Sequence, residues 1–161
     1  MSATAPRPAR GPYAEPVAAP AAGPGIDPRG PQFTAGITAV VLIVILLLPT
    51  PAAAVLTAVQ AVLFGLGAAR GVQRTPTAVL FRRLVRPRLR PPVELEDPAP
   101  PRFAQTVGLV FTLVALVGYL AGVTLLGQIA IGLALVAALL NALFRFCLGC
   151  EMYLLIQRLA H

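Results

Sequence analysis

The sequence predicts an all-α protein, a bundle of four transmembrane helices with a short interfacial helix in its central loop. Four apolar stretches, at residues 33–48, 52–69, 103–126 and 128–144, contain no charged residue. All thirteen basic residues are Arg, and they lie between or outside these stretches. With 57% hydrophobic and 12% charged residues, the 161-residue chain also has too little polar surface to cover a soluble globule. A helix needs about 20 residues to cross a bilayer core, so we expect spans at about residues 33–50, 52–70, 103–126 and 128–147.

The first segment, residues 1–31, is expected to be a disordered cytoplasmic tail. It consists mostly of Pro, Ala, Gly and Arg, and such a composition buries too little apolar surface to offset the entropy lost on ordering. An alternative is a signal peptide, because the apolar run to Leu48 is followed by small residues at 52–54. The long tail and the immediate second span disfavour cleavage. The membrane domain is therefore expected to cover residues 32–161.

An eight-residue motif occurs twice in the chain. The sequence DPRGPQFT at residues 27–34 returns as DPAPPRFA at residues 97–104, and each copy opens a pair of spans. The prolines end any preceding helix, and Phe33 and Phe103 suit the boundary between water and lipid. The motif indicates either convergence on a good helix start or an internal duplication. A duplicated two-span unit would relate the two halves by an axis along the membrane normal.

The charge distribution predicts the orientation in the membrane. The net charge of +7 divides into +1 for residues 1–32, +5 for residues 70–102 and +1 for residues 144–161. Basic residues mark the side that is not translocated, so we expect an inner-membrane protein with both termini and the Arg-rich loop 70–102 in the cytoplasm. The pI near 11.0 does not indicate nucleic-acid binding, because aromatic and basic residues are not interleaved.

The Arg-rich loop contains the predicted interfacial helix. Leu80, Phe81, Leu84 and Val85 share one helical face, and Pro87 would end the helix. Arg near a membrane surface gains about 1 kcal/mol from anionic lipid, so the basic face is a candidate lipid-binding site. Docking of an acidic cytosolic partner is the alternative use of this face. The candidate residues are Arg82, Arg83, Arg86, Arg88 and Arg90.

The two cysteines, Cys147 and Cys150, are the candidate catalytic residues, as a redox pair. Their spacing of three places both thiols on one helical face, at a separation that a disulfide accepts. Haem attachment is excluded because Glu151, not His, follows the second Cys. Zinc would need two further ligands, and only Glu151 and His161 are near, so we predict neither a metal nor a cofactor. The alternative is a pair of reduced thiols that serve as packing residues.

The local charges act on these thiols in opposite directions. Arg145 favours the thiolate, whereas the C-terminal end of the fourth span, where we place the pair, disfavours it. Within the four apolar stretches there is no Asp, Glu, Lys, Arg or His, which argues against a proton-coupled pump. Gln60 and Asn141 are expected to form hydrogen bonds between helices. Gly118 and Gly122 form a GxxxG motif that permits close helix packing, either within one chain or in a homo-oligomer.

Four segments carry a resemblance to a known family. They are DPRGPQF at residues 27–33, LFRRLVRP at 80–87, EDPAPPRFAQ at 96–105 and CLGCE at 147–151. Together, over about residues 25–159, they resemble the actinobacterial family called domain of unknown function 4395. The resemblance implies a small four-helix integral membrane protein without an assigned activity. It also implies thiol or sulfur chemistry, because such proteins are often encoded near thioredoxin-like proteins and sulfurtransferases.

The leading functional hypothesis is an auxiliary, non-enzymatic membrane component of thiol redox or sulfur metabolism. In it, Cys147 and Cys150 cycle between dithiol and disulfide, or exchange with a thioredoxin-like protein or a sulfurtransferase. The alternative is a structural or scaffolding membrane protein that docks an acidic partner or anionic lipid through its Arg-rich loop. A transporter for a small neutral or sulfur-containing solute is a third class, because broken helices can bind solutes without charged groups.

Overall fold

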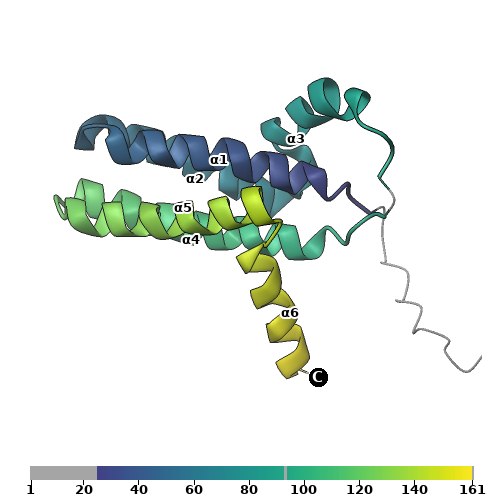
Figure 1. The fold of residues 1–161 in the computed structure, drawn as a ribbon. Helices are drawn as coiled ribbons and strands as arrows, with labels where there is room; N and C mark the ends of the chain where they lie inside the picture. Colours follow the sequence, from purple (N-terminus) through teal and green to yellow (C-terminus); the bar gives the residue numbers. More distant parts are fainter. Residues whose placement is uncertain (1–24, 93, 161) are drawn as a thin grey trace, which may run out of the picture.

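The computed structural model describes residues 25–92 and 94–160 and confirms the predicted all-α fold. Its four long helices are α1 (Arg29–Leu47), α2 (Thr50–Arg70), α4 (Ala99–Leu120) and α5 (Thr124–Phe144). They form two helical hairpins that lie side by side (Figure 1). All four are long and apolar enough to cross a membrane. The described residues therefore have the architecture expected of a multi-pass membrane protein.

Shorter helices follow each hairpin. After α2 come a 3-10 turn, η1 (Val72–Arg74), and then α3 (Pro76–Leu80), which continues through the π-helical turn η2 (Phe81–Val85) into η3 (Arg86–Arg88). We call residues 76–88 the loop helix, and it occupies the position of the predicted interfacial helix. After α5 comes α6 (Leu148–Ala160), which the sequence analysis missed. Figure 1 shows α3 and α6 leaving the bundle on opposite sides, near the same end.

The structure corrects several predicted boundaries. The third span ends at Leu120 instead of residue 126, and the fourth ends at Phe144 instead of residue 147. Gly122 has a φ of +77°, which glycine adopts readily, and it makes the turn that we had placed near Gly127. The predicted tail lies outside the described residues up to residue 24. Residues 25–31 belong to the fold, because Ile26 forms a β-bridge and Arg29 begins α1.

The bundle core is built from small and branched apolar side chains. Helix α1 packs on α5, α2 packs on α4, and α4 also packs on α5. The side chains of Leu42, Ala115 and Ile131 are fully buried at the centre. Many Val, Leu and Ile side chains on the opposite faces of the helices are exposed, for example Val40, Val62 and Val117. Such exposed apolar faces are what lipid-facing helices present.

Two glycines allow α4 and α5 to approach closely. A Cβ on Gly118 would lie 2.8 Å from the backbone nitrogen of Gly127, and a Cβ on Gly127 would lie 2.5 Å from the ring of Tyr119. The first glycine of the GxxxG motif therefore packs within one chain. The second, Gly122, ends α4 instead of forming a helix contact. Homo-oligomer formation through this motif stays a prediction that the structure does not test.

The repeated motif starts α1 and α4 in the same way. The carboxylate of Asp27 accepts the backbone N–H of Arg29 over 3.0 Å, and that of Asp97 accepts the N–H of Ala99 over 2.8 Å. The residues just before the two aspartates, Ile26 and Glu96, pair with each other in an antiparallel β-bridge. An antiparallel pair of equivalent residues is the arrangement that a local two-fold axis produces. The two starts are thus equivalent in structure as well as in sequence.

Long polar side chains join the hairpins in an equally symmetric way. Arg102 of α4 donates to the carbonyl oxygens of Ala68 and Ala69 at the end of α2, over 2.6 and 3.0 Å. Gln32 of α1, the counterpart of Arg102 in the motif, donates to the carbonyl oxygen of Ala142 at the end of α5, over 2.9 Å. The last carbonyls of a helix have no partner within that helix. Each hairpin therefore supplies donors to the helix end of the other.

The short helices extend the equivalence. Thr75 precedes α3, and its hydroxyl accepts the N–H of Ala78 over 3.3 Å. Cys147 precedes α6, and its sulfur accepts the N–H of Cys150, also over 3.3 Å. In both halves the residue before the short helix thus caps the backbone N–H three residues later.

Aromatic pairs fix both short helices in the same manner. Phe81 of the loop helix packs on Phe33 of α1, and Tyr153 of α6 packs on Phe103 of α4. The ring centroids are 5.7 Å apart in both pairs. Each half of the chain is therefore two spans and a short helix that folds back on the first span. This is the arrangement expected of a parallel repeat with its axis along the bundle.

The α4–α5 contact gives a first prediction. Replacement Gly118→Ala should lower the free energy of unfolding by about 1–3 kcal/mol, because the added methyl group meets backbone atoms that cannot move aside. The matched control is Gly132→Ala in α5, where a Cβ meets nothing within 4 Å. We expect the control to be neutral or slightly stabilising. Thermal unfolding of the protein in detergent, followed by circular dichroism, measures both; equal effects would contradict the close contact.

Candidate functional site

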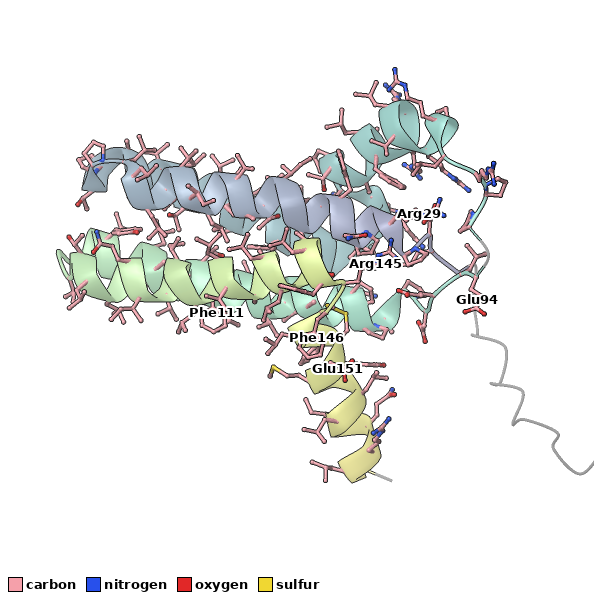
Figure 2. The ribbon with its side chains drawn as sticks, viewed as in Figure 1. Arg29, Glu94, Phe111, Arg145, Phe146 and Glu151 are labelled. Atoms are coloured by element: carbon pink, nitrogen blue, oxygen red, sulfur yellow. A yellow bond between two sulfur atoms is a disulfide. The ribbon has the colours of Figure 1, made fainter. Side chains whose placement is uncertain are left out.

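The cysteine pair lies at the start of α6. Cys147 and Cys150 form a disulfide, with their Cα atoms 5.1 Å apart. Figure 2 shows the sulfur–sulfur bond beside the turn that carries Arg145 and Phe146. The structure brings together the two residues that the sequence predicted as a pair. It corrects their location, because they belong to the N-terminal turn of a separate helix and not to the C-terminal end of the fourth span.

This location reverses the expected effect of the helix end on the thiols. The carbonyl of Cys147 accepts the N–H of Glu151 over 3.0 Å, so Cys147 occupies the capping position of α6. The N–H of Cys150 points at the Cys147 sulfur over 3.3 Å. Backbone N–H groups at a helix N-terminus carry partial positive charge and favour an anionic sulfur. The reduced pair therefore has a local environment that supports the thiolate of Cys147.

The turn between α5 and α6 is built on an unusual backbone conformation. Arg145 has a φ of +57°, in the left-handed region that residues with a Cβ seldom adopt. Its N–H donates to the carbonyl oxygen of Asn141 over 3.1 Å, and the N–H of Phe146 donates to that of Leu140 over 3.3 Å. These bonds pair the last carbonyls of α5 while the chain changes direction. The left-handed residue is what separates α6 from the fourth span.

Helix α6 is fixed against α4 by a close backbone contact. A Cβ on Gly149 would lie 2.7 Å from the Cα and from the Cβ of Ala104. Gly149 stands between the two cysteines, so the pair is held where α6 meets the bundle. Tyr153 packs on Phe103 one turn later and also accepts a hydrogen bond from Gln157 over 2.8 Å. The sequence analysis did not assign roles to these positioning residues.

One side of α6 is apolar and exposed. Leu148, Met152, Leu155 and Leu159 recur at helical spacing, and each of them is exposed. Gln157 lies on the opposite face, and Glu151 and Arg158 flank the apolar side. A short amphipathic helix that leaves a bundle sideways is suited to the membrane interface. This spacing was the sequence signal that could have predicted α6.

The five candidate Arg residues do not form a single basic face. All five are exposed, but only Arg82 and Arg86 line a cavity of about 380 Å³, and the other three lie outside it. Arg88 donates to the carbonyl oxygen of Leu84 over 2.6 Å, and the backbone carbonyl of Arg90 accepts from Arg29 over 2.9 Å. Phe81, expected on the apolar face, is buried against Phe33. Two of the five side chains thus line the cavity, and we call the other three, Arg83, Arg88 and Arg90, the outer basic group.

The remaining sequence predictions have separate outcomes. Gln60 is buried in α2 and lines a small cavity of about 40 Å³ beside Thr38 and Thr75. Asn141 contributes its backbone carbonyl to the turn after α5. Within residues 25–92 and 94–160, no group of three or more His, Cys, Asp or Glu side chains could hold a metal ion. His161 lies outside the described residues.

The fold and this site define the class of protein. It has four apolar helices in two structurally equivalent units, and it carries a cysteine pair on a short amphipathic helix. The chain matches, over residues 26–158, the family described as Domain of unknown function (DUF4395), and it belongs to that family. No curated protein and no solved structure matches the chain.

The turn at Arg145 gives a second prediction. Replacement Arg145→Gly should raise the free energy of unfolding by about 1 kcal/mol relative to Arg145→Ala, because glycine adopts the left-handed conformation without a steric penalty. Both variants remove the same charge, so their difference isolates the backbone conformation. Denaturation of the two variants in the same detergent measures it. Equal stability would show that this turn is not left-handed.

Proposed function

We propose that the protein is an auxiliary component of thiol redox or sulfur metabolism in the membrane, working through Cys147 and Cys150. The observation that supports this proposal is the disulfide within the first turn of α6. Both cysteines belong to one helical turn, and Gly149 between them holds that turn on α4. The disulfide can therefore open and close without displacing the spans. A pair serving only as packing residues would not need a bond between its sulfur atoms.

The chemistry is exchange with a dithiol of a partner. A thiolate of the partner attacks the Cys147 sulfur, the bond between the two cysteines breaks, and Cys150 leaves as a thiolate that takes up a proton. The second thiol of the partner then attacks the mixed disulfide and releases Cys147. Two electrons and two protons pass from the partner to the pair, and the partner becomes a disulfide. The reverse sequence returns them.

The partner in this proposal is a thioredoxin-like protein or a sulfurtransferase, as the family resemblance implies. We further propose that the protein lies in the inner membrane of an actinobacterium, with the Arg-rich loop and α6 on the cytoplasmic side. The excess of Arg in loop 70–102 supports this orientation. The cytoplasm normally keeps thiols reduced, so a disulfide that is held there would support a redox function.

A second candidate function is docking of anionic lipid or an acidic partner by the outer basic group, Arg83, Arg88 and Arg90. The loop helix supports it, because Leu80 and Leu84 are exposed beside these cations. Apolar and basic side chains together suit a membrane surface. Reversing the three outer charges separates the two candidates. Lost recruitment with intact thiol exchange would favour docking.

A labelling experiment tests both which side of the membrane the cysteines face and whether they are oxidised. Maleimide-polymer is added to spheroplasts and to inverted membrane vesicles, with and without prior reduction. We expect labelling of the cysteines only in inverted vesicles, and only after reduction. Labelling in spheroplasts would contradict the proposed orientation. Labelling in inverted vesicles without reduction, under conditions that preserve the redox state, would contradict a stable disulfide.

A trapping experiment tests exchange itself. The variant Cys150→Ser keeps Cys147, whose thiolate attacks the disulfide of an oxidised partner, and it lacks the thiol that would resolve the mixed disulfide, so a covalent adduct should accumulate. The matched control, Cys147→Ser, replaces the capping sulfur by a capping oxygen and should accumulate at least about tenfold less adduct, because Cys150 is not the sulfur that joins the partner in the proposed exchange. Non-reducing gels and mass spectrometry measure the adducts. Equal adducts from both variants, or none from either, would refute the proposed exchange.

A further inference from the structure

The two equivalent units differ at the junction between the short helix and the first span. In the second unit, Gly149 of α6 packs directly on Ala104 of α4. The equivalent residues of the first unit are Thr77 and Thr34, whose hydroxyl groups form a hydrogen bond of 3.1 Å. The first unit thus has two threonine side chains where the second has a direct contact between Gly149 and Ala104. Beside them lies the cavity of about 380 Å³, which Thr34 helps to line.

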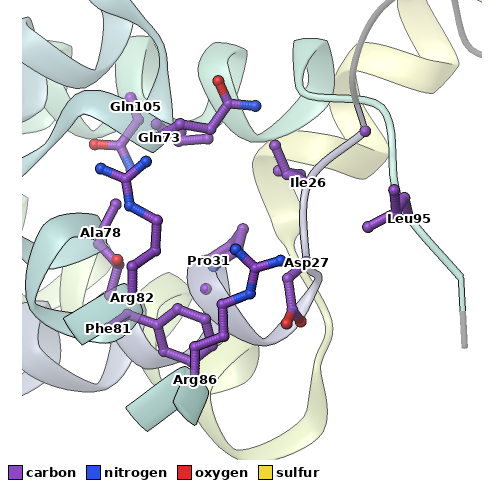
Figure 3. A pocket seen from close by; sticks show the side chains of 14 residues that line it. Ile26, Asp27, Pro31, Gln73, Ala78, Phe81, Arg82, Arg86, Leu95 and Gln105 are labelled. Carbon is purple, nitrogen blue, oxygen red and sulfur yellow. The ribbon is translucent and has the colours of Figure 1, made fainter. Parts of the chain in front are cut away.

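The cavity combines an apolar wall with hydrogen-bond donors. Its apolar wall consists of Ile26, Pro31, Val72, Phe81 and Leu95. Its polar side chains are mainly donors, the guanidinium groups of Arg82 and Arg86 and the amides of Gln73 and Gln105. Figure 3 shows the Arg82 guanidinium pointing toward Gln105, and the Arg86 guanidinium lying toward Pro31 and Asp27. The donors therefore come from four positions on three different elements around one space.

The charge of this lining favours an anion. The lining contains two guanidinium groups and one carboxylate, that of Asp27. This carboxylate already accepts the backbone N–H of Arg29 over 3.0 Å. Guanidinium groups bind the oxygens of phosphate and carboxylate through paired hydrogen bonds. Two guanidinium groups and two amides together offer more donors than a carboxylate with two oxygens can accept from one side. A phosphate, with its tetrahedral oxygens, suits donors that converge from several directions.

We propose that this cavity is a binding site for a phosphate group, with Arg82 and Arg86 as its main ligands. The apolar wall would contact the organic part of a phosphate ester. The phosphate has two sources, a small soluble phosphate compound or the head group of an anionic lipid at the membrane interface. This site is separate from the cysteine pair, since the loop helix and α6 leave the bundle on opposite sides (Figure 1).

The experiment uses the full chain and two probes. Inorganic phosphate is titrated against the protein in a neutral detergent, and binding is followed by thermal unfolding and by phosphorus NMR. In parallel, the protein is placed in nanodiscs of phosphatidylcholine with and without phosphatidylglycerol, and its thermal unfolding is compared. Saturable binding of inorganic phosphate would support a soluble phosphate compound. Stabilisation by phosphatidylglycerol alone would support the lipid head group, and an effect of neither probe would overturn the proposal.

Matched variants locate the site. Each lost guanidinium should weaken binding about tenfold or more, so Arg82→Gln with Arg86→Gln should abolish saturation in the accessible range. The control pair, Arg83→Gln with Arg90→Gln, removes the same charge from exposed positions outside the cavity and should change affinity less than about twofold. Equal losses of phosphate affinity in both double variants would show that only the general surface charge matters, and would contradict a site at Arg82 and Arg86.

A third variant removes the space without changing any charge. Ala78 lines the cavity, and Ala78→Leu should fill part of it and weaken phosphate binding about tenfold. This variant decides the matter if the double Arg variant fails to fold. Unchanged binding by a folded Ala78→Leu protein, shown by its circular dichroism spectrum, would place the phosphate elsewhere and refute the assignment.

Discussion

The fold depends on how the helix ends are satisfied at one end of the bundle. A helix leaves its last carbonyl groups without partners inside the helix, and an unpaired carbonyl group is costly in a hydrocarbon layer. Here Arg102 reaches the end of α2, and Gln32 reaches the end of α5. Each hairpin thus pairs carbonyl groups at a helix end of the other, which holds the two hairpins together. The same exchange brings both short helices, and with them both candidate sites, to one end of the molecule.

The four spans could be predicted because charge and apolar residues are strictly separated in the chain. Their boundaries could not, because residues 121–127 carry no charge through the turn at Gly122 and include one polar side chain, Thr124, so hydropathy gives little signal there. The cysteine spacing predicted the pair but not its helix. A left-handed Arg145 starts a new helix where the sequence indicated the end of an old one, and such a conformation is normally signalled by Gly or Asn.

The Arg-rich loop shows a second limit of sequence reasoning. Helical spacing placed Arg82, Arg83 and Arg86 on one basic face, opposite Phe81. The structure buries Phe81 on Phe33, and the chain runs through the wider π-helical turn η2 at this point, so the positions no longer follow the regular α-helical pattern. Two of the three side chains consequently line the cavity. Tertiary packing decides which Arg side chains line the cavity, and the local sequence pattern does not encode that packing.

The paired caps of the short helices have a consequence for how the cysteine site tolerates change. Thr75 and Cys147 accept equivalent backbone N–H groups in the two halves, Thr75 through its hydroxyl oxygen and Cys147 through its sulfur. The proposed sulfur chemistry thus occupies a position where a hydroxyl supports the same architecture in the other half. Loss of the sulfur atoms would therefore remove the proposed exchange and leave the fold intact.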